Sequence, residues 1–241
     1  MNRYAVVAVF FAVALAGCGG LMGDTSTGPI ADGYNETGVE NVSLAIQTHA
    51  EAVESSQYSY EQTVETGGTT GSFEIHSGPS GTIATQSSSN GASRSVWRDA
   101  DSAEVRTQRG EQATYSALAG NVSIALSNSR TGSTLRAAEQ FPRTIIQQVA
   151  FDAAGGTDWN GVSVREYEAT GFRIAGVNGT VDGRMLVDAE GRVRHIDIDL
   201  TQQTGGQELS VDIETSLTEV GSATASEPDW TGDAPSVSVV N

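Results

Sequence analysis

The sequence predicts an α+β fold in which antiparallel strands form a sheet and a few helices pack on it. Apolar residues recur at helical spacing over 37–55, and a strict alternation of apolar and polar residues begins at Gln57. Helical spacing returns over 135–151 and is followed by further alternating segments. Of the 241 residues, 38% are hydrophobic, which is enough for one modest core. One folded domain is therefore expected.

The N-terminus predicts a cleaved signal peptide over 1–17. Ala5 to Ala16 is an uncharged apolar run that follows a single arginine, Arg3. It is too short to span a bilayer, which takes about 20 helical residues. The run ends in Leu15-Ala16-Gly17-Cys18, which resembles the lipobox of bacterial and archaeal lipoproteins.

The lipobox resemblance implies that Cys18 is lipidated and becomes the first mature residue. Cys18 is the only cysteine, so no disulfide within the chain can form. The expected location is the cell membrane, with the protein anchored by its lipid and facing the extracellular side. The alternative is an ordinary cleaved signal with an incidental cysteine.

Composition excludes several functions. All 13 basic residues are arginine, and the net charge is −17. The absence of lysine excludes phosphate-loop, Schiff-base and pyridoxal chemistry, and the acidic excess argues against binding nucleic acid. Lysine-free, acid-rich composition resembles that of secreted proteins from extremely halophilic archaea, in which molar salt screens the repulsion between carboxylates. The alternative is an acidic surface that captures cations or a basic partner.

The first half of the mature chain predicts a tether, a helix and a meander of strands. Residues 18–36 lack periodicity and predict a flexible tether. A helix is expected to open at Thr37, with Glu40 completing a capping box, and to end near Ser55. A hairpin turning at Gly67-Gly68 follows. Further strands are expected at 82–87, 92–98, 103–108 and 112–118.

The second half predicts a broken helix and a closing meander. Pro142 lies within 135–151, where it would break or restart a helix, so two short helices are expected. After a turn at Gly155-Gly156, strands are expected at 162–170, 172–177, 180–187, 193–204 and 207–219. Residues 221–241 lose periodicity and predict a mobile tail.

This order of elements over 37–220 resembles the LolA/LppX type of envelope lipoprotein. The resemblance implies a strongly curved antiparallel sheet, an open half-barrel, whose concave apolar face is covered by an N-terminal helix and a broken central helix and accepts acyl chains. Two segments also resemble haloarchaeal membrane lipoproteins of uncharacterised function: Thr48-His49-Ala50-Glu51 leading to Ser56-Gln57-Tyr58-Ser59-Tyr60, and Val187-Asp188-Ala189-Glu190-Gly191-Arg192-Val193.

No catalytic group, metal site or cofactor is predicted. No Gly-x-Ser-x-Gly motif occurs, and the histidines at 49, 76 and 195 have no metal-binding spacing. His195, Asp197 and Asp199 would share one strand face, where the alternatives are a divalent-cation site and a solvated acidic face. The chain is therefore expected not to be an enzyme. Glycosylation sequons begin at Asn35, Asn41, Asn121 and Asn178.

An apolar ligand site is the main functional expectation. Its candidate lining residues are Tyr58, Tyr60, Phe73, Ile75, Trp97 and Phe141. The same residues can equally form plain core. The expected function is noncovalent binding or carriage of a lipid or other apolar molecule; the alternative is a structural or partner-binding envelope module without a ligand, whose protein partner the sequence does not identify.

Overall fold

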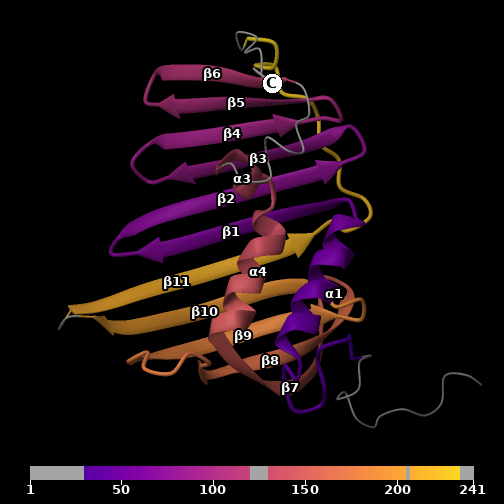
Figure 1. Ribbon diagram of the computed structural model, residues 1–241, viewed down its shortest axis with the longest axis vertical. Helices are drawn as coiled ribbons and strands as arrows, with labels where there is room; N and C mark the ends of the chain where they lie inside the picture. Colours follow the sequence, from indigo (N-terminus) through magenta and orange to yellow (C-terminus); the bar gives the residue numbers. More distant parts are fainter. Residues whose placement is uncertain (1–29, 120–129, 205–206, 234–241) are drawn as a thin grey trace, which may run out of the picture.

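A computed structural model describes residues 30–119, 130–204 and 207–233 (Figure 1). Eleven strands form a single antiparallel sheet. Their bounds are β1 Tyr58–Thr66, β2 Thr69–Gly78, β3 Gly81–Ser88, β4 Ala92–Arg98, β5 Ser102–Arg109, β6 Gln112–Ala119, β7 Val149–Trp159, β8 Val162–Phe172, β9 Gly179–Asp188, β10 Val193–Thr204 and β11 Gln207–Thr218.

The sheet consists of two meanders joined side by side. Its strand order is β6-β5-β4-β3-β2-β1-β11-β10-β9-β8-β7, so the first and last strands of the chain's strand series, β1 and β11, pair in the middle of the sheet. β6 and β7 form the two edges and do not pair with each other, so the sheet is open. The predicted antiparallel sheet with a few helices is thus confirmed in outline, whereas the half-barrel curvature stays a prediction.

The helices α1 Val42–Glu54, α3 Arg130–Leu135 and α4 Ala137–Gln148 lie on one side of the sheet, which we call the helix face (Figure 1). The predicted start of the first helix at Thr37 is wrong. Asn41 caps α1 instead, with its side-chain oxygen accepting from Leu44 N at 3.1 Å. Thr37 lies in a turn held by Asn35, whose side chain accepts from Gly38 N at 2.8 Å.

The central region also differs from the prediction. The break between the two helices is at Arg136, and Pro142 lies inside α4. Residues 149–159 form strand β7 rather than the end of a helix and a turn. Gly155 and Gly156 are part of this strand, and they lie at one of its two register shifts against β8.

Two apolar clusters form the core beneath the helices. One joins α1, α3 and α4 to β1–β5 through a buried cross-strand row, Tyr60, Ile75, Ala84, Val96 and Val105. The other joins α1 and α4 to β7–β11 and contains Ile146, Tyr167, Met185, Ile196 and Ile198. Ala31 and Tyr34 belong to this second cluster, so the predicted tether of 18–36 is already packed in its described part, from Ala31 onward.

The opposite face of the sheet carries a smaller cluster. Trp97, Ala225 and Trp230 are buried together there, and Gly232 N donates to a Glu104 side-chain oxygen at 2.8 Å. Residues 221–233 therefore pack on the sheet, where the sequence predicted a mobile tail, because Trp230 buries its ring beside Trp97. None of the helices in the described residues is long and apolar enough to cross a membrane.

Candidate apolar ligand groove

The side chains of β10 and β11 that point to the helix face change from buried to exposed along each strand. On β10, Ile196 and Ile198 are 0% and 1% exposed, whereas Leu200 is half-buried. On β11, Leu217 and Ile213 are buried, Val211 is half-buried and Leu209 is 45% exposed. The cross-strand pair Leu200 and Val211 thus marks where helix cover ends.

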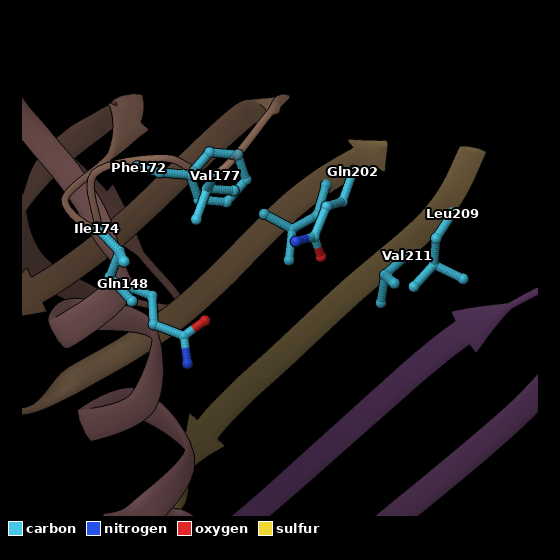
Figure 2. A pocket seen from close by; sticks show the side chains of 8 residues that line it. Gln148, Phe172, Ile174, Val177, Gln202, Leu209 and Val211 are labelled. Carbon is cyan, nitrogen blue, oxygen red and sulfur yellow. The ribbon is translucent and has the colours of Figure 1, made fainter. Parts of the chain in front are cut away.

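A pocket of about 110 Å³ lies at this uncovered end (Figure 2). It is bounded by the last residue of α4, Gln148, by the end of β8 and the β8–β9 connection, and by β10 and β11. We call this pocket and the apolar surface around it the groove. Its lining residues are Gln148, Phe172, Ile174, Val177, Leu200, Gln202, Leu209 and Val211.

Two exposed aliphatic side chains lie together in the groove. Among the described residues, the large hydrophobic side chains that are exposed are Ile30, Leu44, Ile174 and Leu209. Two of these, Ile174 at 53% and Leu209 at 45%, line the groove from different elements. Six of the eight lining residues are apolar, and the amides of Gln148 and Gln202 supply the polar groups at its rim. The groove therefore combines apolar contact area with hydrogen-bonding groups, as ligand sites do.

At the other end of the helix face, a buried histidine hydrogen-bonds to a helix carbonyl that has no helical donor because of a proline. We call this end, where helices cover the sheet, the closed end. Pro142 has no N–H, so the carbonyl of Ala138, four residues earlier in α4, lacks its helical donor. His49 of α1 donates to that carbonyl through Nε2 at 2.9 Å, and its Nδ1 accepts from Val193 N at 3.1 Å. One buried imidazole thus ties α1 to α4 and to the start of β10.

Burial lowers the pKa of His49 from 6.5 to about 4, and the nearby Arg192 adds to the effect against the opposing bond to Ala138. The neutral ring with its proton on Nε2 satisfies both contacts. His49 therefore has a structural role in this arrangement.

The β9–β10 turn completes the closed end. Asp188, which is 2% exposed, accepts from Glu190 N at 3.0 Å and from Arg192 N at 2.9 Å through one carboxylate oxygen. Its other oxygen pairs with Arg192 at 3.3 Å and Arg194 at 3.6 Å. Arg192 Nε in turn donates to the carbonyl of Ala52 in α1 at 3.3 Å. The two segments singled out in the sequence, around His49 and around Asp188, thus meet in space.

The predicted ligand residues fall into three places. Tyr58, Tyr60 and Ile75 are buried in the core beneath α1, α3 and α4, and Phe73 packs beside them half-buried. Phe141 is half-buried on α4 against the second cluster, which Leu200 and Val211 also contact. Trp97 points to the opposite face, because it is the neighbour of the inward-facing Val96 on β4. None of the six lines the groove.

His195, Asp197 and Asp199, which were expected to share one strand face, differ in burial. His195 follows a register shift in β10 and is buried, with its ring stacked on Trp159 at 4.2 Å between centroids. Asp197 and Asp199 are exposed. Within the described ranges, no group of three or more metal-ligating side chains is placed to hold a metal ion.

A serine, a histidine and a glutamate lie in line on the opposite face. Ser59 Oγ is 2.9 Å from His76 Nδ1, and His76 Nε2 is 2.7 Å from a Glu74 carboxylate oxygen. Ser59 Oγ donates its proton to Glu219 at 2.6 Å, so it has none left to give to the histidine. Ser59 is also 3% exposed, and this geometry does not activate it as a nucleophile.

The sequons differ in position. Asn35 and Asn41 use their side-chain oxygens within the fold, as described above, and Asn178 is exposed in the β8–β9 connection beside the groove residue Val177. Asn121 and the anchor residue Cys18 lie outside the described residues.

The groove was not predicted, because residues 172–177 were expected to form a strand. In the structure β8 ends at Phe172, and Ile174 and Val177 belong to a connecting segment that forms the rim. One feature of the sequence could have indicated the groove. The apolar alternation of β11 starts at Leu209 and continues to Leu217, so the strand is longer than the part that the helices cover.

Family membership follows from the sequence as a whole. The chain belongs to DUF7537, a family of unknown function, which it matches over residues 3–234. No curated protein matches the chain.

Three solved structures containing MucB are similar to this family member, and each similarity covers 78% of the chain. They are MucB alone, with 16% identity and a TM-score of 0.35; MucB in complex with MucA(peri), with 13% and 0.34; and the MucA/MucB complex of Pseudomonas aeruginosa, with 15% and 0.34. The chain spans 58% to 61% of the length of these MucB chains.

Proposed function

We propose that this protein binds an apolar chain noncovalently in the groove at the uncovered end of the helix face. The observation that carries the proposal is the exposure of Ile174 and Leu209 on facing sides of one pocket. A soluble domain gains nothing from leaving two large aliphatic side chains in water at the same place. An acyl or isoprenoid chain is the ligand chemistry that fits such a surface.

The volume of the pocket limits how the ligand is held. About 110 Å³ is below the roughly 300 to 1,000 Å³ of typical enclosed ligand sites, so the pocket takes only part of a chain. Five methylene groups buried there contribute about 4 kcal/mol, which alone corresponds to about millimolar affinity. Tighter binding requires the chain to extend past the pocket, toward the half-buried side chain of Phe141, which packs on the same core cluster as the lining residues Leu200 and Val211.

Binding of a fluorescent acyl probe tests the proposal. Leu209→Ser and Ile174→Ser each remove an exposed apolar contact, and we expect each to weaken probe binding about tenfold. Leu44→Ser is the matched control, because Leu44 is 38% exposed on α1, away from the groove. Equal affinities for all three variants and the unchanged protein would reject the groove as the site.

The anchor and the environment complete the proposal. The protein is held to the outer side of the membrane by a lipid on Cys18, as the lipobox resemblance implies. Cys18→Ser should move the protein from the membrane fraction to the soluble fraction, because no helix in the described residues is long and apolar enough to cross a membrane. Retention of this variant in the membrane after normal processing would contradict the anchor.

The acidic face supports the proposal of a high-salt environment. Glu65, Asp212, Asp199 and Asp182 lie directly opposite one another across four adjacent strands. Partial desolvation and the negative charges of the neighbouring Asp212, Asp197 and Asp182 raise the pKa of Asp199, although its side chain is exposed. Like charges at such positions destabilise a sheet unless salt screens them. Circular dichroism should therefore show loss of the fold as salt falls from molar to millimolar, and an unchanged thermal midpoint would contradict this.

A second candidate function is the binding of a protein partner without a lipid ligand. The small volume of the pocket favours it, since about 110 Å³ accepts a single large apolar side chain. The same two variants discriminate the candidates. If they leave binding of every acyl and isoprenoid probe unchanged and no lipid is extracted from the purified protein, the partner-binding function replaces ligand carriage.

A further inference from the structure

The two edges of the sheet differ in how they are protected. At β7, the N-terminal segment covers part of the edge: Gly38 forms a bridge with Asp152, and Ala153 N donates to the carbonyl of Thr37 at 3.1 Å. Two register shifts also bend this strand, at Ala150/Phe151 and at Ala153/Gly155. Covering segments and bulges are how natural sheets prevent another strand from pairing with an edge.

In residues 30–119, 130–204 and 207–233, nothing protects β6 in these ways. It pairs with β5 from Ser102 and Ala119 to Arg109 and Gln112 without a register shift. Its sequence, QATYSALA, contains no charged residue, no proline and no glycine. Within the described part of the chain, no segment pairs with its outer side. Unpaired N–H and C=O groups on a straight, uncharged strand form a template for another strand.

The charge of the chain is distributed so that a second copy can approach this edge. Residues 92–119, which include β4 to β6, contain four arginines and four acidic residues. Residues 149–219, which include β7 to β11, contain five arginines and thirteen acidic residues. Residues 221–233, which pack on this end, add Glu227, Asp229 and Asp233 and no arginine, so the β4–β6 end has four arginines and seven acidic residues. Two copies that carry −17 each repel over most of their surface, but they repel less at the β4–β6 end than at the more acidic β7–β11 end.

We propose that β6 is a dimer interface, at which β6 of a second copy of this chain adds antiparallel to β6 and continues the sheet across a two-fold axis. The contact uses the same strand on both copies, so it closes on itself. Because β7 is bent and partly covered, the joined sheet does not extend further, and the assembly stops at two copies rather than growing into a fibre. The proposal is independent of the groove, which lies on β8 to β11.

Disulfide cross-linking of the full chain tests the contact. In a Cys18→Ser background, Gln112→Cys, Thr114→Cys and Ser116→Cys are made one at a time on β6, with Thr157→Cys on β7 as the matched control. The side chains at all four positions are exposed. We expect oxidation to give a covalent dimer from at least one β6 position and none from Thr157→Cys. Equal cross-linking at both edges, or none at β6, would overturn the proposal.

Charge substitution gives a second, noncovalent readout. Thr114→Lys and Ser116→Lys place like charges across the two-fold axis, and we expect each to weaken dimerisation about tenfold in sedimentation equilibrium at high salt. Thr157→Lys should leave the dimer unchanged. A full chain that sediments as a monomer, or a dimer that resists both β6 substitutions, would also overturn the proposal.

Discussion

The two ends of the helix face are built from the same strands and have opposite properties. At the closed end, the β9–β10 turn packs beneath α1, and the side chains of His49, Asp188 and Arg192 all bond to partners inside the protein. At the groove end, β10 and β11 continue past the helices and present Leu200, Leu209 and Val211 to solvent. The difference indicates that stability is concentrated at the closed end, whereas the ligand site that we propose lies at the other end. Substitutions at the two ends should therefore separate folding from binding.

Asp188→Ala should have the largest effect on the closed end. It removes the acceptor of two backbone N–H groups and leaves Arg192 and Arg194 without their buried carboxylate. Breaking a buried pair of this kind costs about 3 to 5 kcal/mol. Chemical denaturation should show a loss of this size, and a loss below about 1 kcal/mol would mean that the turn does not hold α1 in place.

His49→Ala should be nearly as damaging. The substitution leaves Ala138 O and Val193 N buried without a partner, which together cost about 3 kcal/mol. A second variant, Pro142→Ala, checks the reason, because it restores the N–H that can bond to Ala138 O within α4. We expect His49→Ala to be less destabilising in the Pro142→Ala background, and strictly additive losses would contradict the link between the two residues.

Acid should weaken the closed end through His49. Because the folded state lowers the pKa of His49 to about 4 from 6.5, the unfolded chain binds the proton more readily between these values. The contribution of His49 is present above pH 6.5 and is lost as the pH falls toward 4, up to about 3 kcal/mol. His49→Gln should show a shallower fall in its thermal midpoint over this range than the unchanged protein does. Parallel pH curves would contradict the assignment.

Leu209→Ser should have the smallest effect on stability. Its side chain is 45% exposed, so the free energy of unfolding should change by less than about 0.5 kcal/mol. The matched substitution Leu217→Ser, on the same face of β11 but buried, should cost several times more. If both variants lost the same stability, the groove end would be part of the core.

The fold could be predicted from the sequence where periodicity is local. Alternation in 193–204 and 207–219 gave two correct antiparallel strands, and the run from Gln57 to Leu118 gave β1 to β6. Strand β7 was missed because its two glycines suggest a turn, although here they lie at a bulge. The direction of Trp97 depends on register rather than on alternation alone, and its partner Trp230 lies in a segment with no periodicity.

The site was predicted less well, for a physical reason. Tyr58, Tyr60 and Ile75 are residue types that also line ligand pockets. Whether they form a pocket or a core depends on how far the helices extend over the sheet, and here the helices cover them. The role of His49 likewise depends on the Ala138 carbonyl, which has no helical donor because of Pro142. Pro142 lies 93 residues after His49 in the sequence. Such contacts are made by tertiary packing and leave no local pattern.

Photo-crosslinking with a diazirine-labelled fatty acid tests the central claim most directly. After irradiation and digestion of the protein, mass spectrometry locates the modified residues. We expect label on 172–177 and on 209–211, and less label after Ile174→Ser. Label confined to the buried residues Tyr58, Tyr60 and Ile75, or label spread equally over the molecule and unaffected by excess unlabelled fatty acid, would contradict the groove as the binding site.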